Sequence, residues 1–94
     1  MSVYLVDRNL PGITMDQLAA AQKSAIETAR RFTEEGKPVR YIRSTYVPGE
    51  SHCMCLFESG SEALVRDVNQ TAGIPFTRIL EAHDLTPSAT VSKE

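Results

Sequence analysis

The sequence predicts a ferredoxin-like βαββαβ plait of the α+β class: a four-stranded antiparallel sheet, in the order 4-1-3-2, with two helices on one face. Two helix-capping signatures and two proline-marked stops divide residues 2–84 into strand, helix, strand, strand, helix and strand. Each β-α-β half requires a right-handed crossover, and two such crossovers place both helices on the same side of the sheet. Few compact folds accept this order in so short a chain.

The first half begins with a strand at residues 2–8, rich in β-branched and aromatic side chains. Thr14 and Gln17 have the spacing of a capping box, which predicts a helix that continues to about Glu35. Gly36 stops that helix. Residues 39–47 are predicted to form the second strand.

The second half begins with Pro48-Gly49, which suits the centre of a type II turn and predicts a hairpin over residues 39–58. The next helix starts near Ser59 or near its rival cap Ser61. Gly73 ends this helix, and the proline two residues later prevents its return. The last strand is predicted at residues 76–83.

Length and composition indicate one domain, since 94 residues with 41% hydrophobic and 23% charged content are ordinary for a folded soluble chain. We assign it to residues 1–85 and expect residues 86–94 to be a flexible C-terminal tail. The net charge of −2 gives no electrostatic case for binding nucleic acid or an anionic membrane. No apolar run approaches the ~20 residues of a membrane helix, and no secretory signal is recognisable. A cytoplasmic protein is the expectation.

The two predicted central strands carry apolar side chains on both faces, whereas a sheet with one solvated face alternates more cleanly. Something is therefore expected to cover the face without helices. A second copy of the chain is the simplest cover, which predicts a homodimer. An extra helix is the other option, but the polar tail does not suit it. The residues concerned are Val3 and Leu5 against Tyr4 and Val6, and Cys53, Cys55 and Phe57 against Met54 and Leu56.

The densest group of soft metal ligands is His52-Cys53-Met54-Cys55. Thiolate and imidazole ligands suit Zn(II), Ni(II) and Cu(I). Cys53 and Cys55 point to one face of their strand and could converge on one ion, whereas His52 and Glu58 point to the other. The alternative is that both cysteines are small buried hydrophobes in a central strand. A disulfide between them is not expected. Their Cα atoms are about 6.6–6.8 Å apart in a strand, which is near the upper limit for a disulfide bridge.

A second candidate site could be built from strand arginines, which can bind a carboxylate or phosphate. Strand alternation places Arg43 on the face of Tyr41. The alternative for the arginines is ordinary salt bridges at strand edges. His83 could act as a ligand or general base, or lie at the surface. The predicted ligand-binding residues are Tyr41, Arg43, Arg78, Glu81 and His83.

Three motifs together resemble a small bacterial family, formerly a domain of unknown function and now labelled nickel-responsive or nickel-binding in actinobacteria. They are G-I-T-x-x-Q-L-x-x-A-x in residues 12–22, C-L-x-E-x-x-S-x-x-x-V in 55–65, and V-N-x-x-A-G-I-P in 68–75. The resemblance covers nearly all of residues 3–84. It implies a ferredoxin-like fold, a dimer, and Ni(II) binding for at least the histidine-rich branch.

This chain resembles a histidine-poor branch of that family. The nickel-type branch carries histidines where this chain has the segment 7–9, Asn69 and Ile74. Only Cys55 and Glu58 match transferable polar positions. The resemblance thus implies a weakened site for Ni(II) or another divalent transition metal, or none, with oxygen ligands favouring harder ions. The predicted metal-site residues are Cys53, Cys55, Asp7, Glu58 and His52.

Three functions follow as hypotheses. The first is a small dimeric binding protein for a transition metal or a small ligand. The second, by fold analogy, is a cofactor-free monooxygenase, cyclase or isomerase, with Tyr41, Arg43, His52, Glu81 and His83 as its candidate residues. The third is a structural or regulatory partner without a ligand. A Cys/His/carboxylate cluster would favour the first, a pocket lined by Arg and Tyr the second, and a filled interior the third. No P-loop, nucleophile elbow or H-E-x-x-H motif occurs.

Overall fold

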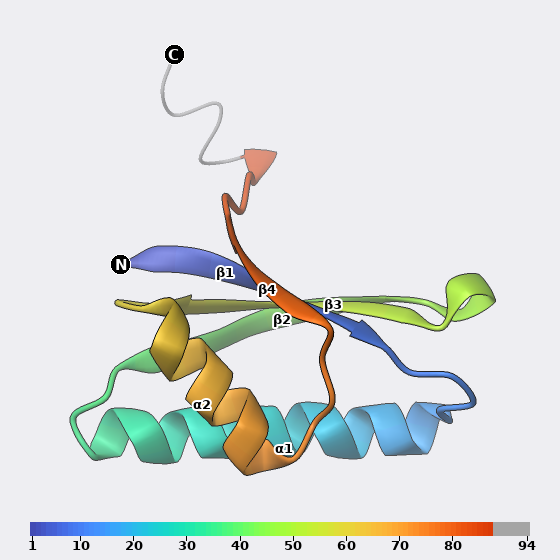
Figure 1. Ribbon diagram of the computed structural model, residues 1–94, viewed down its shortest axis with the longest axis horizontal. Helices are drawn as coiled ribbons and strands as arrows, with labels where there is room; N and C mark the ends of the chain where they lie inside the picture. The colour runs from blue at the N-terminus through green and yellow to red at the C-terminus, as the bar shows by residue number, and fades with distance from the viewer. Residues whose placement is uncertain (88–94) are drawn as a thin grey trace.

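The computed structural model describes residues 1–87 and confirms the predicted plait, with four antiparallel strands in the order β2-β3-β1-β4. Both helices lie on one side of the sheet (Figure 1). Most of the expected tail, from residue 88 on, lies outside the described residues. No described helix is both long and apolar enough to cross a membrane. The elements are β1 (Ser2–Asn9), α1 (Met15–Glu34), β2 (Val39–Val47), the 3₁₀ turn η1 (Pro48–Glu50), β3 (His52–Ser59), α2 (Glu62–Ala72) and β4 (Arg78–Ala82).

The helix ends follow the local signals of the sequence. At the start of α1, the Thr14 hydroxyl accepts from the Gln17 amide at 3.1 Å, and the Gln17 side chain accepts from the Thr14 amide at 2.9 Å. The predicted capping box is therefore confirmed. Ser61 caps α2 by accepting from the Leu64 amide at 3.2 Å. Gly73, with φ of 73°, lets the chain leave α2 in the left-handed conformation that glycine favours.

Two local predictions are corrected. Pro48 and Gly49 form a 3₁₀ turn rather than a type II turn, and the positive φ of 52° falls on Ser51. Proline at the start of a helical turn is favourable because its fixed φ suits that position. The last strand is shorter than predicted and begins at Arg78. Ahead of it, the Thr77 amide and hydroxyl both donate to the Asp7 carbonyl, at 2.7 and 2.9 Å.

A β-bulge interrupts the pairing of β2 with β3 between Tyr41 and Arg43. Tyr41 lies opposite Phe57 and Ser44 opposite Cys55, so both face the helices. Arg43 instead pairs with Leu56 on the other side of the sheet. The predicted shared face of Tyr41 and Arg43 is therefore wrong, because the bulge reverses the alternation between them.

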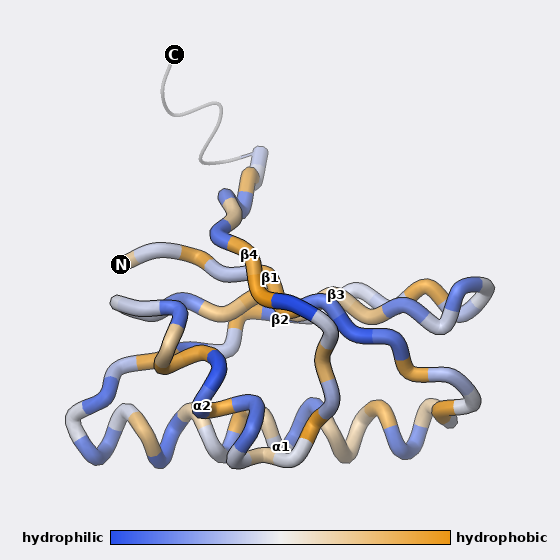
Figure 2. The backbone as a smooth tube through the Cα atoms, viewed as in Figure 1, coloured by the Kyte–Doolittle hydropathy of each residue, from blue (hydrophilic) through white to orange (hydrophobic). Residues whose placement is uncertain are grey.

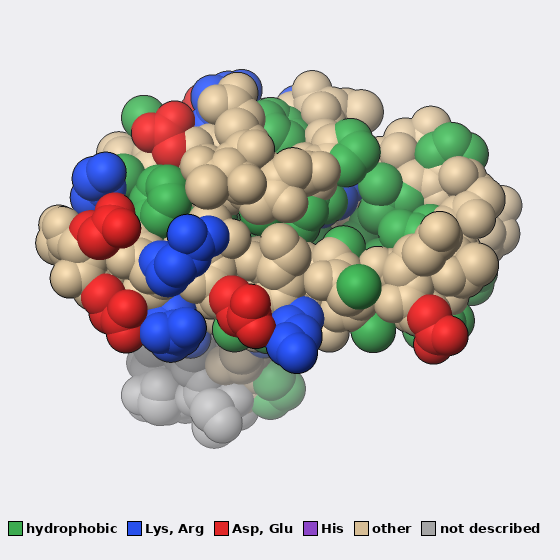
Figure 3. All heavy atoms as spheres, turned by 90° about the horizontal axis from the view of Figure 1, so that it is seen from below, with side chains coloured by type: hydrophobic (Ala, Val, Ile, Leu, Met, Phe, Trp, Pro, Cys, Tyr) green, Lys and Arg blue, Asp and Glu red, His purple; other side chains and the backbone are tan. Residues whose placement is uncertain are grey.

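The core lies between the sheet and the helices, and hydrophobic residues recur along the strands and helices that enclose it (Figure 2). Phe57 of β3 and Val65 of α2 are 0% exposed. Ala25 and Ala29 bring α1 close to the sheet, because a methyl group leaves little space between backbones. The helix surface mixes acidic and basic side chains without a field of one sign (Figure 3).

The opposite side of the sheet, called the open face below, carries no element of the described chain. Pairing across the strands gathers apolar side chains there. Leu5 pairs with both Leu56 and Leu80, and Leu80 is 44% exposed. Val3 and Met54 also lie on this face. The sheet therefore has the two partly apolar faces that the sequence predicted.

Candidate functional site

A pocket of about 270 Å³ lies between α1 and the sheet. Its wall is mostly aliphatic, and one end, called the polar end below, is formed by Arg8, Ser44, Cys53 and Cys55. Tyr41 and Tyr46 of β2 and Gln22 of α1 also line it. The aliphatic lining comprises Leu10, Leu18, Ala19, Ala21, Ala25 and Ile74, together with Met15.

Strand register brings the polar end together. Arg8 follows Tyr4 and Val6 on the helix side of β1, since strand side chains alternate. Arg8 pairs with Cys53 across the β1–β3 ladder, and Cys55 is the next residue of β3 on the same face. The bulge of β2 adds Ser44 opposite Cys55. Both cysteines lie buried on the helix side of the sheet, which confirms the alternative that they are small core residues, and both are free thiols.

Arg8 is 2% exposed, and its guanidinium is surrounded by neutral or sulfur acceptors. Its Nε donates to Cys55 Sγ at 3.3 Å, and its second terminal nitrogen donates to Asn69 Oδ1 at 2.6 Å. Its first terminal nitrogen donates to the carbonyl oxygens of Ile74 and Pro75, at 3.5 and 3.3 Å. None of the salt bridges among the described residues joins Arg8 to a carboxylate.

A chain of hydrogen bonds runs from α1 to the Cys55 sulfur. Ser44 Oγ donates to Cys55 Sγ at 2.9 Å. The Ser44 hydroxyl has one proton, so the Tyr41 hydroxyl, 2.6 Å away, must donate to it. Gln22 in turn donates to the Tyr41 oxygen at 2.9 Å. Every donor in this series of hydrogen bonds therefore points toward the Cys55 sulfur, which accepts the last of them.

Cys53 is the second sulfur at the polar end of the pocket. Its Sγ lies 3.8 Å from Cys55 Sγ. Burial, and then the charge and hydrogen bond of Cys55, raise the pKa of the Cys53 thiol to about 12, although the nearby Arg8 opposes the shift. The polar end thus combines a thiol at Cys53 with a sulfur at Cys55 that accepts from two donors.

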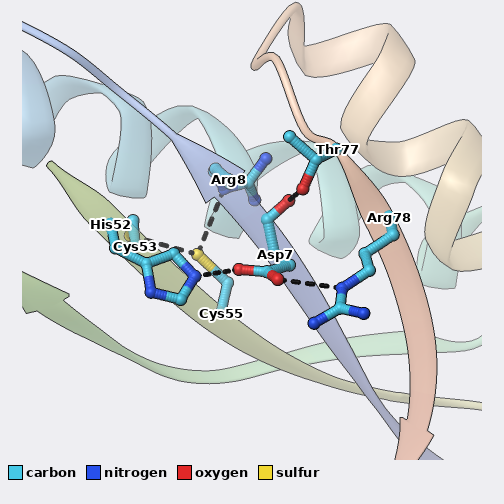
Figure 4. A network of polar contacts seen from close by, with 7 residues as sticks. All are labelled: Asp7, Arg8, His52, Cys53, Cys55, Thr77 and Arg78. Carbon is cyan, nitrogen blue, oxygen red and sulfur yellow. Dashed lines mark hydrogen bonds and ion pairs between the residues drawn. The ribbon is translucent and has the colours of Figure 1, made fainter. Parts of the chain in front are cut away.

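The other predicted metal-site residues lie across the sheet. Asp7 and Arg8 are adjacent in β1 and point to opposite faces (Figure 4). Asp7 contacts His52 and accepts from Arg78 Nε at 3.0 Å. Burial alone would raise the pKa of Asp7, but hydrogen bonds and charge from His52 and Arg78 hold it below its ordinary value. Glu58 on the same face pairs with an exposed arginine of β2.

The five residues predicted for a metal site therefore form two groups, with Cys53 and Cys55 on the helix side and the other three on the open face. Nowhere in residues 1–87 do three or more His, Cys, Asp or Glu side chains lie together in a way that could hold a metal ion. The sheet separates the soft sulfur ligands from the imidazole and the carboxylates.

The five predicted ligand-binding residues are also dispersed. Tyr41 alone lines the pocket. Arg43 contacts Asp84, and Arg78 binds Asp7, both on the open face. Glu81 is exposed on β4, and His83 is exposed beyond its end. The alternative prediction of ordinary strand salt bridges is confirmed for Arg78.

The predicted metal-site and ligand-binding sets did not include Arg8, Ser44 or Asn69, although Arg8 was among the strand arginines considered and Asn69 was a possible oxygen ligand. Arg8 had a readable signal, because strand alternation places it on the same face as Tyr4 and Val6. Ser44 had none, since only the bulge turns it toward the helices. Asn69 followed from the resemblance as a replaced histidine, and its side chain reaches Arg8.

The pocket fits a metal ion only in part. Two sulfurs 3.8 Å apart have about the separation required of two thiolates on one tetrahedral ion, with metal–sulfur bonds of about 2.3 Å. However, no histidine or carboxylate joins them in the pocket lining, and a fixed cation donates to Cys55. Thiolate ligation also requires Cys53 to lose its proton. The described residues therefore do not form a complete nickel site.

This chain is similar to a known sequence family and to solved structures. The sequence model of a family described as "Nickel responsive protein SCO4226-like" matches residues 4–82. The crystal structure of SCO4226 from Streptomyces coelicolor A3(2) superposes with a TM-score of 0.74 and 23% sequence identity, covering 90% of this chain and 100% of that chain. At this identity the superposition shows a shared fold. No curated protein matches the sequence.

Proposed function

The chain belongs to the SCO4226-like family of nickel-responsive proteins, and on this premise we propose that it is a small dimeric binding protein whose ligand lies between α1 and the sheet. The pocket itself carries the proposal. Ligand sites are typically concave and mostly apolar with a few polar groups. The polar end and aliphatic wall of this pocket have that composition.

The lining indicates the kind of ligand. A volume of about 270 Å³ is slightly below the range of about 300–1,000 Å³ that is usual for ligand sites. Arg8 contributes a positive charge at the polar end, and Ala21 and Leu18 contribute an apolar wall. We infer a small organic acid with an aromatic or branched aliphatic body, its acceptor group toward Arg8. Benzoate has this chemistry and serves as the probe.

Binding is favoured over catalysis because the pocket lacks a general base. The enzyme hypothesis predicted a cavity lined by arginine and tyrosine, and Arg8, Tyr41 and Tyr46 do line this one. Proton transfer usually depends on a histidine or carboxylate within hydrogen-bond reach. Neither occurs in its described lining. Turnover would thus have to depend on Cys55 or a tyrosine.

Nickel binding is the second candidate, favoured by the family and by the 3.8 Å spacing of the two sulfurs. In this form, Cys53 and Cys55 would supply two thiolates, and the remaining ligands would come from solvent or a bound molecule. Binding would tighten as pH rises, because the ion must displace the proton of Cys53. The nearby Arg8 cation opposes it.

The proposed dimer rests on the open face. Leu5, Leu56 and Leu80 form a row across three strands that no described element covers. A second copy placed sheet to sheet would remove this row from water at about 25 cal/mol per Å². An isologous contact of this kind closes as a pair and leaves no further surface for growth.

The test is native mass spectrometry of untagged protein purified without chelator, followed by separate titrations with benzoate, Ni(II) and Zn(II). We expect a dimer that binds benzoate. Ala21→Leu, which fills the pocket, should weaken benzoate binding, whereas Ala63→Leu on the exposed side of α2 should not. Equal binding by both variants would contradict the pocket proposal. One Ni(II) per chain, lost in Cys55→Ala, would support the nickel candidate instead.

A further inference from the structure

Arg8 is the largest fully buried side chain of the described chain, which makes it unusual. Arginine is almost never fully buried unless it is paired. Removing an ion from water costs several kcal/mol even after the surroundings relax. The structure must therefore compensate this charge without a carboxylate.

The compensation comes from four acceptors that converge on the guanidinium, here called the acceptor cage. They are Cys55 Sγ of β3, Asn69 Oδ1 of α2, and the carbonyl oxygens of Ile74 and Pro75 from the α2–β4 connection. Three separate parts of the chain thus direct lone pairs at one point.

The cage is held in place by contacts of its own. The Asn69 amide donates to the Val65 carbonyl at 2.8 Å, which turns its oxygen toward Arg8. Gly73 ends α2 in the left-handed conformation immediately before Ile74 and Pro75, which aims their carbonyls inward. Ser44 donates to the Cys55 sulfur. These contacts, made by the acceptors with groups other than Arg8, hold the acceptor atoms in position independently of the cation between them.

We propose that the acceptor cage is a cation site that the Arg8 guanidinium fills in place of a metal ion. One soft sulfur, one amide oxygen and two carbonyl oxygens are the ligand types that cations accept in proteins. In this family context, the chain carries its own cation and needs no nickel at this position. The inference concerns the cage and does not depend on the organic ligand proposed for the pocket.

Replacing Arg8 with a neutral ligand should open the cage to a metal ion. In Arg8→His, an imidazole replaces the guanidinium beside Cys55, which gives a nitrogen and a sulfur ligand for Ni(II). Arg8→Lys is the matched control, because it keeps a positive charge in the cage. The double variant Arg8→His/Cys55→Ala removes the sulfur.

The experiment is titration with Ni(II), read by native mass spectrometry and by the near-ultraviolet absorption of thiolate-to-nickel charge transfer. We expect Arg8→His to bind one Ni(II) per chain with this absorption, and the double variant to lose both. The wild type and Arg8→Lys should show no such absorption. Charge-transfer absorption in the wild type that disappears in Cys55→Ala would overturn the proposal, and this measurement holds even if Arg8→His does not fold. A folded Arg8→His protein that ignores Ni(II) would also overturn it.

Discussion

Cys55 is the residue on which the polar contacts of the pocket converge. It accepts from Arg8 on one side and from Ser44 on the other, and the chain through Tyr41 and Gln22 directs further donors toward it. Cys53 lies on the same face of the same strand, but among the described residues its sulfur contacts that of Cys55 and accepts no hydrogen bond from Arg8 or Ser44. Replacing Cys55 would therefore leave hydrogen-bond donors without an acceptor, whereas replacing Cys53, a cysteine of equal size, would not.

We predict that Cys55→Ala destabilises the protein more than Cys53→Ala. Both changes remove a buried sulfur, but the first also leaves Arg8 Nε and the Ser44 hydroxyl without an acceptor. An unsatisfied buried donor costs about 1–3 kcal/mol, so the two free energies of unfolding should differ by at least about 1 kcal/mol. Urea denaturation of both variants measures this. Equal losses would mean that the sulfur contacts contribute nothing.

The lowered pKa of Asp7, on the open face, predicts that the protein loses stability in acid. His52 and Arg78 hold its pKa below the ordinary 3.8 despite burial, so the folded state favours the carboxylate. The resulting stabilisation is complete above about pH 3.8 and is lost as pH falls through the lower folded-state pKa. The difference in free energy of unfolding between the wild type and Asp7→Asn should therefore become smaller as the pH falls.

Urea denaturation between pH 2 and pH 6 checks this prediction. Asp67→Asn, on the exposed side of α2, is the control, because it removes a carboxylate away from the His52 and Arg78 contacts. If the difference in free energy of unfolding between the wild type and Asp7→Asn stays constant down to pH 2, Asp7 is not the group whose protonation destabilises the protein in acid.

The end of α2 links secondary structure to the site. Gly73 adopts φ of 73°, and the next two residues supply carbonyl oxygens to Arg8. We predict that Gly73→Ala costs about 1–2 kcal/mol, because a Cβ is strained in this region. Gly49→Ala is the control, since that glycine has no positive φ and open space around it. Thermal unfolding should show a lower midpoint for Gly73→Ala alone.

The elements that follow local signals could be predicted, and those set by tertiary contacts could not. The capping box of Thr14 and the glycine stop of Gly73 depend on neighbours in sequence, so both were readable. The bulge between Tyr41 and Arg43 depends on the partner strand, and it reversed the predicted face of Arg43. The site was therefore predicted less well than the fold.

The burial of Arg8 is another feature that depends on tertiary contacts and could not be predicted from the sequence. Its face could be read from strand alternation, but its burial depends on Asn69 and on the carbonyls that follow α2, which lie more than sixty residues away. An arginine in isolation is expected at the surface. Strand alternation already placed Cys53 and Cys55 on one face and His52 and Glu58 on the other, and the structure shows that this separation keeps the five residues from forming one metal site.

At the scale of the whole molecule, one face of the sheet is covered by helices and the other is open. We predict that Leu80→Glu on the open face converts the proposed dimer to a monomer, because it places a charge in the proposed interface. Ile26→Glu on α1 is a close control, with 45% exposure against 44% for Leu80. Size-exclusion chromatography with light scattering reads both. Dissociation by Ile26→Glu alone would place the interface on the helices.

The buried guanidinium also bears on how the protein matures. A metal ion must be delivered after synthesis, can be withdrawn by a chelator, and can be exchanged for a competing ion. A cation built into β1 arrives during translation, in a fixed ratio of one per chain, and cannot dissociate from the folded molecule. The acceptor cage of this chain is therefore filled as soon as folding is complete, independently of the metal supply of the cell.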